Sequence, residues 1–247
     1  MVEITRDTIM GGRVIIFQPI GGYRVSIDSV LLAAAIPAKL GELILDVGSG
    51  TGAVSMSLAI RCDGVFVTGL EIQKKFVNLA KNGAQETGLN GRVEFLEGDL
   101  LSPPEGLQIG RFDHVMANPP YVTSGQGNSP IDQSKCQATV EGNTTLKDWL
   151  NFLVTCVRDG GSITIIHRYD RSDEVTSILK KFGAGNAVIF PLWHNQEDKV
   201  IKRVIVQAYK GKDWFLQTLP GLVLHDENGF YTKKTEEVLR LGKALLL

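Results

Sequence analysis

Cysteine is scarce in this sequence, with only three among 247 residues. The number is odd, and Cys62, Cys136 and Cys156 are scattered without the short spacing that metal ligands show. A disulfide-stabilised secreted domain and a cysteine-based zinc site both need closely patterned cysteines, and His114, His167 and His194 do not form a recognisable metal set either. We therefore expect reduced, structural thiols and no metal site.

Long apolar runs are also absent. No stretch is apolar over the roughly 20 residues that a membrane-spanning helix needs. The first residues, MVEITRDTIMGG, lack the charged and then apolar pattern of a secretion signal. We therefore expect a cytoplasmic protein that does not bind membranes, and we favour a monomer.

An excess of either charge is missing too, since the formal net charge is −1. This excludes a protein that coats nucleic acid non-specifically, but a local basic face can still bind one folded RNA. An ordinary solvated surface is the alternative interpretation for each basic cluster. The candidate clusters are Lys199, Lys202 and Arg203, and Lys233, Lys234, Arg240 and Lys243.

From residue 43 onward, short apolar runs alternate with amphipathic stretches. This alternation predicts an α/β fold, Rossmann-like, with a seven-stranded mostly parallel sheet and helices on both faces. The last two strands have no helix between them, so we expect an antiparallel edge strand. The predicted strands are 43–47, 65–71, 92–99, 112–118, 162–167, 187–193 and 200–210. The predicted helices are 53–62, 73–88, 145–161 with Thr144 or Thr145 as N-cap, and 172–183.

The chain divides into two unequal parts. Residues 1–42 are too short for an independent domain, so we expect an N-terminal extension that packs on the core, with a strand at 13–19 and a helix at 26–37. Residues 43–247 form the main domain, which ends in a hairpin around DENG and a helix. The polar segment 122–144 is long for a loop, which is typical of a functional lid or of disorder.

A glycine-rich turn, DVGSGTG, runs from Asp46 to Gly52 between a predicted strand and a predicted helix. Such a turn lets the backbone approach a ligand closely, although an ordinary tight turn is the alternative. Glu71 and Asp99 end the next two strands, where carboxylates can accept hydrogen bonds from ribose hydroxyls and from an adenine amino group. We therefore predict an adenosine-bearing cofactor. Nicotinamide dinucleotides fit less well, because the loop reads G-x-G-x-G and not G-x-G-x-x-G.

The motifs DVGSGTG, GLEI, EGDLL and NPPY, in this order, resemble the class I S-adenosylmethionine-dependent methyltransferases. NPPY is typical of the branch that methylates exocyclic or amide nitrogens. The flanks QPIGGYRVSIDSVLLAAAIPA and GLVLHDENGFYTKKTEEVLRLGKALL resemble the bacterial tRNA1(Val) (adenine-37-N6)-methyltransferase family. The resemblance implies S-adenosylmethionine as cofactor and a tRNA anticodon loop as partner. It also implies a set of cofactor-binding residues, which are Ser26, Asp28, Asp46, Gly48, Gly50, Gly52, Glu71, Ile72, Asp99, Leu100 and Asn118.

The stretch ANPPY suits transfer to a flat amine. The lone pair of such an amine is delocalised, so two hydrogen-bond acceptors must turn it toward the methyl group. Asn118 offers its side-chain oxygen and Pro119 its backbone carbonyl, while Pro120 stiffens the turn. Tyr121 can stack on the base. We predict that these four residues are the catalytic set and that they act by orientation and by removal of water.

Several alternatives stay open at this level. Ser26 or Asp28 can cap the helix at 26–37, or, with Tyr23 and Arg24, can lie near the methionine part of the cofactor. A protein glutamine-N5 methyltransferase acting on release factors shares the core motifs, but such enzymes usually carry a large helical domain before the core. A non-catalytic RNA-binding protein on the same fold is a further alternative.

Overall fold

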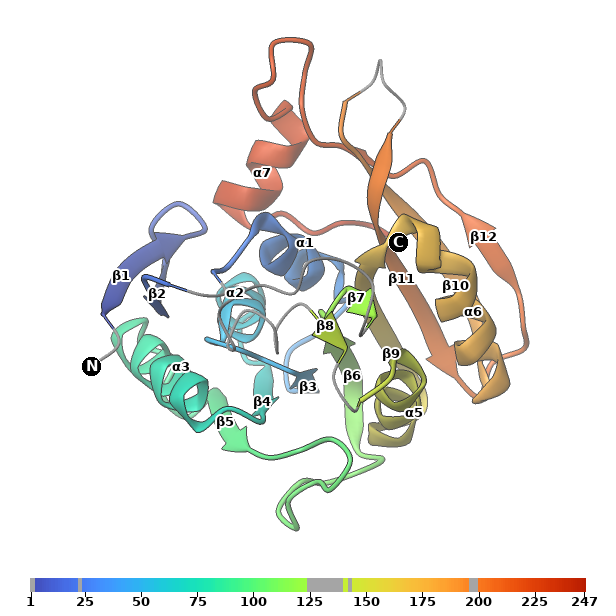
Figure 1. Cartoon of the computed structure of the whole chain (residues 1–247), viewed down its shortest axis with the longest axis horizontal. Helices are drawn as coiled ribbons and strands as arrows, with labels where there is room; N and C mark the ends of the chain where they lie inside the picture. The colour runs from blue at the N-terminus through green and yellow to red at the C-terminus, as the bar shows by residue number, and fades with distance from the viewer. Residues whose placement is uncertain (1–2, 22–23, 124–139, 142–143, 196–199) are drawn as a thin grey trace.

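One large β-sheet forms the centre of the computed structural model, which describes residues 3–21, 24–123, 140–141, 144–195 and 200–247 (Figure 1). Its long strands lie in the order β5, β4, β3, β6, β9, β11 and β10. Neighbours are parallel except at β11, which is antiparallel to both β9 and β10. The bounds are Val93–Glu97 for β5, Phe66–Glu71 for β4, Leu43–Val47 for β3, Phe112–Ala117 for β6, Val157–Arg168 for β9, Ile201–Lys210 for β11 and Ala184–Trp193 for β10.

The mostly parallel α/β architecture is confirmed, but two details of the predicted sheet are corrected. Two short strands, β12 (Leu216–Thr218) and β13 (Leu222–Val223), pair with β10 and extend the sheet to nine strands. The antiparallel strand β11 lies inside the sheet and not at its edge. Helix α6 (Ser172–Lys181) connects β9 to β10, which lies two strand positions away in the sheet. Strand β11 then fills the position between β9 and β10.

Helices cover both faces of the sheet, as predicted. Neighbouring residues of a strand point to opposite faces, and on β3 Ile44 belongs to one buried cluster while Leu45 belongs to the other. Helices α1 (Ile27–Ala35), α2 (Ala53–Arg61) and α3 (Lys74–Glu86) contribute to the first cluster. Helix α5 (Leu146–Cys156) and α6 contribute to the second. Helix α7 (Lys233–Leu241) packs against α1, and a short 3₁₀ turn, η1 (Tyr169–Arg171), precedes α6.

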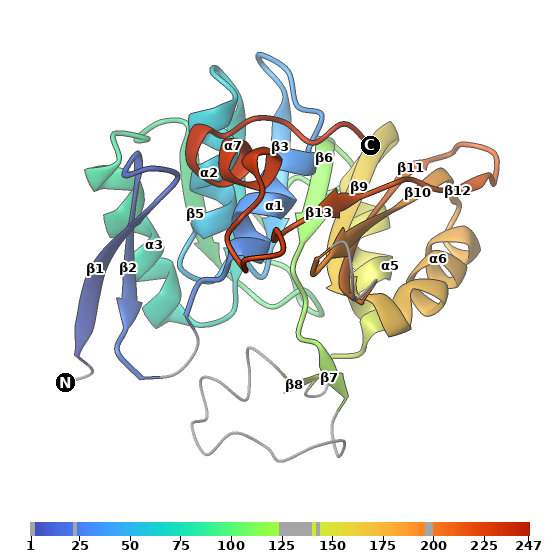
Figure 2. The ribbon, with the colours of Figure 1, turned by 90° about the horizontal axis from the view of Figure 1, so that it is seen from above.

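The N-terminal segment forms a hairpin beside α3 (Figures 1 and 2). Strand β1 (Ile4–Ile9) pairs antiparallel with β2 (Val14–Pro19). The Ile15 N–H donates to Thr87 Oγ1 at 3.0 Å, and Arg6 pairs with Glu86 at 2.8 Å. A second short pair, β7 (Val122–Thr123) with β8 (Val140–Glu141), projects from the body of the molecule (Figure 2). Both strands belong to the polar segment 122–144, of which residues 124–139 and 142–143 lie outside the described part.

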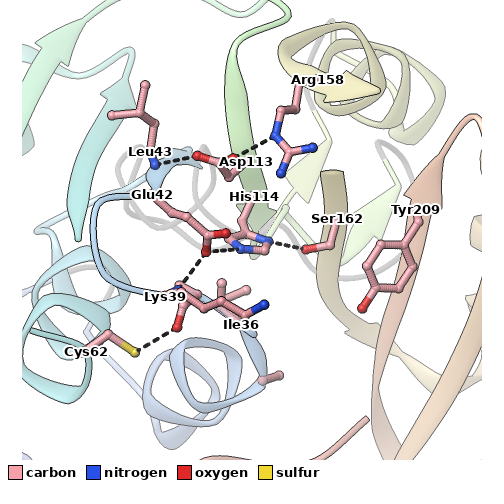
Figure 3. Close-up of polar contacts among 12 residues, drawn as sticks. Ile36, Lys39, Glu42, Leu43, Cys62, Asp113, His114, Arg158, Ser162 and Tyr209 are labelled. Carbon is pink, nitrogen blue, oxygen red and sulfur yellow. Dashed lines mark hydrogen bonds and ion pairs between the residues drawn. The ribbon is translucent and has the colours of Figure 1, made fainter. Parts of the chain in front are cut away.

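A polar network closes the amino-terminal edge of the sheet, opposite the strand ends that carry the motifs (Figure 3). His114 Nδ1 lies 2.7 Å from Ser162 Oγ, and its Nε2 lies 2.9 Å from Glu42 Oε2. Burial lowers the pKa of His114, while the Glu42 carboxylate acts in the opposite direction. The network therefore ties the loop before β3 to β6 and β9.

Helix α5 begins as predicted but ends earlier. Thr145 is its N-cap and forms a capping box with Asp148. The helix stops at Cys156, and residues 157–161, which were predicted to be helical, belong to β9. A Cβ on Gly161 would lie 2.6 Å from the Asp113 carbonyl oxygen, so this glycine allows β9 to approach β6 closely. In the sequence, such a glycine cannot be told from a helix stop.

The capping box yields a first prediction. Thr145→Ala should lower the free energy of unfolding by about 1 kcal/mol, because it leaves the Asp148 N–H in the first turn of α5 without its acceptor. Thr144→Ala is the matched control and should change stability by less than about 0.5 kcal/mol. Urea denaturation of both variants measures the difference, and equal effects would contradict the assigned cap.

Candidate active site

The motif residues meet where the strand order reverses. The chain runs from β3 outward to β4 and β5, and then returns to place β6 on the other side of β3. The carboxyl ends of β3 and β6 therefore lie side by side, with the glycine loop after one and Asn118 after the other. In open parallel sheets this position is where ligands bind.

The glycine loop needs glycine at each of its three positions. Gly48, Gly50 and Gly52 have φ values of +70°, +55° and +82°. A Cβ on Gly48 would lie 2.5 Å from the Trp149 ring, and one on Gly52 would lie 2.5 Å from the Phe95 ring. A Cβ on Gly50 would meet no atom within 4 Å. Gly50 therefore borders open space, while Gly48 and Gly52 pack against the side chains of Trp149 and Phe95.

Glu71 holds the loop at the end of β4. Its Oε2 accepts a hydrogen bond from the Gly50 N–H at 2.9 Å, and its Oε1 accepts one from the Gln73 N–H at 2.8 Å. Burial raises the pKa of Glu71, and these backbone donors oppose the rise. Each carboxylate oxygen keeps a lone pair that can accept a hydrogen bond from a hydroxyl group. The adjacent Ile72 is 60% exposed and offers an apolar surface beside this carboxylate.

Asp46 supports the loop from within the protein. Its Oδ2 accepts hydrogen bonds from the Ser55 N–H at 3.2 Å and from the Ser55 hydroxyl at 2.6 Å. Burial raises the pKa of Asp46 to about 7, and the Glu71 carboxylate adds to the rise. The enclosed side chain thus fixes the first turn of α2 to β3.

Asp99 and Leu100 follow β5 on the same edge and are half-buried. Asp99 Oδ1 accepts a hydrogen bond from the Leu101 N–H at 2.9 Å, which closes a local turn. Together with Glu71 and Ile72, they border the strand ends next to the glycine loop. This arrangement can hold a nucleoside, with carboxylates for its hydroxyl and amino groups and aliphatic side chains for its ring.

The NPPY turn lies at the end of β6, and its tyrosine contacts three other elements. The Tyr121 hydroxyl is hydrogen-bonded to Asn118 Oδ1 and lies 3.1 Å from Asp28 Oδ2 of α1. The Arg203 guanidinium of β11 lies 4.1 Å from the centre of the Tyr121 ring. The His167 ring of β9 meets the Tyr121 ring edge to face, with centres 5.4 Å apart.

Nothing in the sequence marks His167 as part of the site. It is fully buried, and within the described part of the chain neither ring nitrogen makes a hydrogen bond of good geometry. The adjacent Arg168 backbone nonetheless comes near enough to favour the charged ring. Burial lowers the pKa of His167 to about 4, and the Arg171 guanidinium adds to this effect. The ring is therefore neutral at physiological pH.

The start of α1 shows which of Ser26 and Asp28 caps the helix. Ser26 is the N-cap, and its hydroxyl accepts from the Asp28 N–H at 3.3 Å. The Asp28 carboxylate lies against Tyr121 and Arg203. Arg24 pairs with Asp7 of the N-terminal hairpin at 2.9 Å, and Tyr23 lies outside the described residues.

The two basic clusters lie in different surroundings. Arg203 reaches the site, and its neighbour Lys202 is exposed on the same strand. On and after α7, Arg240 pairs with Glu236, and Lys243 pairs with Glu237 at 3.1 Å. Lys199 lies outside the described residues. The sequence carries no signal for Arg203 at the site, because its contact with Tyr121 depends on the strand order.

Among the residues that the structure describes, no three His, Cys, Asp or Glu side chains are grouped so that they could hold a metal ion. None of the helices in this part of the chain is long and apolar enough to cross a bilayer.

Comparisons with known proteins agree with this geometry. Residues 22–141 match the family model described as "Methyltransferase small domain". The release factor glutamine methyltransferase of Moorella thermoacetica is 31% identical over 147 residues, which cover 57% of this chain and 51% of that protein. The chain therefore spans about half the length of that relative. The tRNA1(Val) (adenine(37)-N6)-methyltransferase of Pedobacter heparinus is 23% identical over 217 residues, which cover 88% of this chain and 89% of that protein.

A solved structure shows the same fold. The predicted O-methyltransferase Atu636 from Agrobacterium tumefaciens has a TM-score of 0.72 at 22% identity, covering 88% of this chain and 97% of that one. The expected fold class and the resemblance to methyltransferases are confirmed.

The buried His167 yields a second prediction. Its pKa is about 4 in the folded protein against an ordinary value of 6.5, so below pH 6.5 the unfolded chain binds a proton that the folded protein does not. The wild type should therefore lose about 1 kcal/mol of stability per pH unit between pH 6 and 5, relative to His167→Phe. Denaturant unfolding of both proteins at the two pH values measures this difference. His194→Phe removes an exposed ring and should behave as the wild type; a parallel pH dependence in all three proteins would contradict the buried neutral state.

Proposed function

Since residues 22–141 match the methyltransferase small domain family, we propose that this chain methylates the N6 amine of an adenine in tRNA, using S-adenosylmethionine. The observation that carries the proposal is the meeting of two loops at one sheet edge. One is the glycine loop with open space at Gly50, and the other is the turn at Asn118. The first suits a nucleoside cofactor and the second suits a flat amine.

The residues present fit S-adenosylmethionine. Glu71 can accept the ribose hydroxyls, while Ile72 and Leu100 can flank the adenine and Asp99 can accept its amino group. The open space beside Gly50 allows the cofactor to approach the backbone closely. When bound, the cofactor supplies a methyl group activated by its sulfonium charge.

The protein's own contribution is orientation. Asn118 Oδ1 and the Pro119 carbonyl accept the two N–H groups of the target amine, which turns its lone pair out of conjugation. Tyr121 stacks on the base and holds its plane. The amine becomes acidic as it gains the methyl group, so its proton can leave without a strong base. Positioning and exclusion of water account for the catalysis.

Transfer RNA is the substrate favoured over a release factor. The named tRNA relative aligns along 88% of this chain, whereas the release factor enzyme aligns along 57%. Exposed Lys202, next to Arg203 on β11, can contact a phosphate beside the catalytic turn. A base in an anticodon loop leaves its stack at little cost. The names of the tRNA relatives specify adenine 37, and on that likeness we propose the same position here. We further place the enzyme in the cytoplasm as a monomer.

The direct test measures methyl transfer from labelled S-adenosylmethionine to unmodified bulk tRNA, with a release factor as the parallel substrate. N6-methyladenosine in a valine tRNA is expected. Label in the release factor alone would establish glutamine methylation instead. Cofactor binding without label in either substrate would support a non-catalytic role.

Asn118→Ala yields a third prediction. The variant should lose transfer by a factor of at least about 100, because the amine loses one of its two acceptors. The dissociation constant for S-adenosylmethionine, measured by calorimetry, should change less than threefold. A variant that loses cofactor binding to the same extent as transfer would contradict the role assigned to Asn118.

A further inference from the structure

The Tyr121 hydroxyl has one proton, and two acceptors among the described residues lie within its reach. One is Asn118 Oδ1, to which it is hydrogen-bonded, and the other is Asp28 Oδ2 at 3.1 Å. Asn118 Oδ1 is also the oxygen that the proposed function assigns to the target amine. The tyrosine hydroxyl occupies one of the two lone-pair directions of this oxygen, so the target amine must either share the oxygen with the tyrosine or displace that hydrogen bond.

Asp28 is held in place as the second acceptor. Its Oδ2 lies 3.4 Å from Arg203 Nε, and its side chain is only 15% exposed. The same guanidinium lies over the face of the Tyr121 ring, while the His167 ring stands nearly perpendicular to it, at 85°. The ring is therefore fixed, but its hydroxyl hydrogen can still rotate about the C–O bond.

We propose that Asp28, paired with Arg203, acts as a receiver, which accepts the Tyr121 hydrogen bond in place of Asn118 when the target amine binds. This role rests on the proposed function. The hydroxyl keeps its proton throughout, and no covalent bond changes. The amine donates to Asn118 as the hydroxyl turns to Asp28, so no polar group is left without a partner during the exchange.

The pairing also suits the charge that develops in the reaction. The amine becomes cationic as it attacks the methyl group, and an isolated arginine beside it would oppose that change. Asp28 neutralises Arg203, so the pair presents no net charge to the amine. Both are positioning residues, because they act through Tyr121 and Asn118.

Removal of the receiver yields the fourth prediction. Asp28→Ala should lower kcat/KM for tRNA by on the order of 10- to 100-fold, because the tyrosine hydroxyl then stays on Asn118. Asp28→Asn keeps an acceptor oxygen and should fall between the wild type and Asp28→Ala. Affinity for tRNA in the presence of S-adenosylhomocysteine should weaken in the same order.

The decisive variant is the double substitution Asp28→Ala with Tyr121→Phe. Phenylalanine keeps the ring but cannot occupy Asn118, so the double variant should recover about tenfold of the lost kcat/KM. Tyr121→Phe alone should lose less than about fivefold. A merely structural role of Asp28 predicts no recovery, and a double variant no better than Asp28→Ala would overturn the proposal.

Two controls distinguish the receiver role from a general loss of charge pairing and from a loss of cofactor binding. Asp170→Ala removes another aspartate that pairs with an arginine near the same strand ends, Arg168, and should leave transfer within twofold of the wild type. The dissociation constant for S-adenosylmethionine should be unchanged in Asp28→Ala. A large increase would assign Asp28 to the cofactor and overturn the receiver role. Absence of transfer by the wild type would instead overturn the proposed function, and the receiver role with it.

Discussion

The attachment of the glycine loop to the end of β4 sets the geometry of the sheet edge at which the candidate site lies. The Leu70 carbonyl accepts hydrogen bonds from the N–H groups of Gly48 and Ser49 at 2.8 and 3.1 Å, and Glu71 accepts one from Gly50. These bonds require a run of positive φ angles that side chains strongly disfavour, which is why glycine recurs at alternate positions. The loop then leads directly into α2, whose first turn is fixed by Asp46. The N–H groups of Gly48, Ser49 and Gly50 all donate to acceptors within the protein. The open space beside Gly50 is therefore the part of the loop that a ligand can approach.

The position of β11 links the sheet to the NPPY turn after β6. Neighbouring strands lie about 4.8 Å apart. If β11 lay outside β10, as its place in the sequence suggests, Arg203 would be about one strand spacing farther from β9 and would not reach the Tyr121 ring. Insertion beside β9 brings the guanidinium to 4.1 Å from that ring and within reach of Asp28 on α1. One tyrosine after β6 is thus oriented by α1, β9 and β11, so the N-terminal segment and the C-terminal half of the chain both shape the turn.

Patterns local in the sequence predicted local structure well. The buried run at 43–47, the glycine loop and the helix cap at Thr144 or Thr145 all depend on neighbouring residues. Each was predicted, and the structure assigns the cap to Thr145. Strand order was not predictable, because it depends on packing between distant segments. β1, β12 and β13 were missed because they are short or only half-buried and lack a strong apolar alternation. The same limit applies to the candidate site. Glu71, Asp99 and Asn118 were predicted from their places at strand ends and stay predictions, whereas His167 and Arg203 come near Tyr121 only through the three-dimensional fold.

The orientation of Tyr121 also bears on the choice between the two kinds of flat amine. Asn118 and Pro119 would accept the N–H groups of a glutamine amide as readily as those of adenine, so these acceptors do not discriminate. A glutamine side chain, however, has no extended ring to stack, and the plane of a nearby tyrosine would matter little to it. Here a guanidinium on the face, a histidine ring perpendicular to the tyrosine ring and a hydrogen-bonded hydroxyl together fix that plane. Such restraint is useful when an aromatic base must lie parallel to the ring, and it therefore favours adenine as the methyl acceptor.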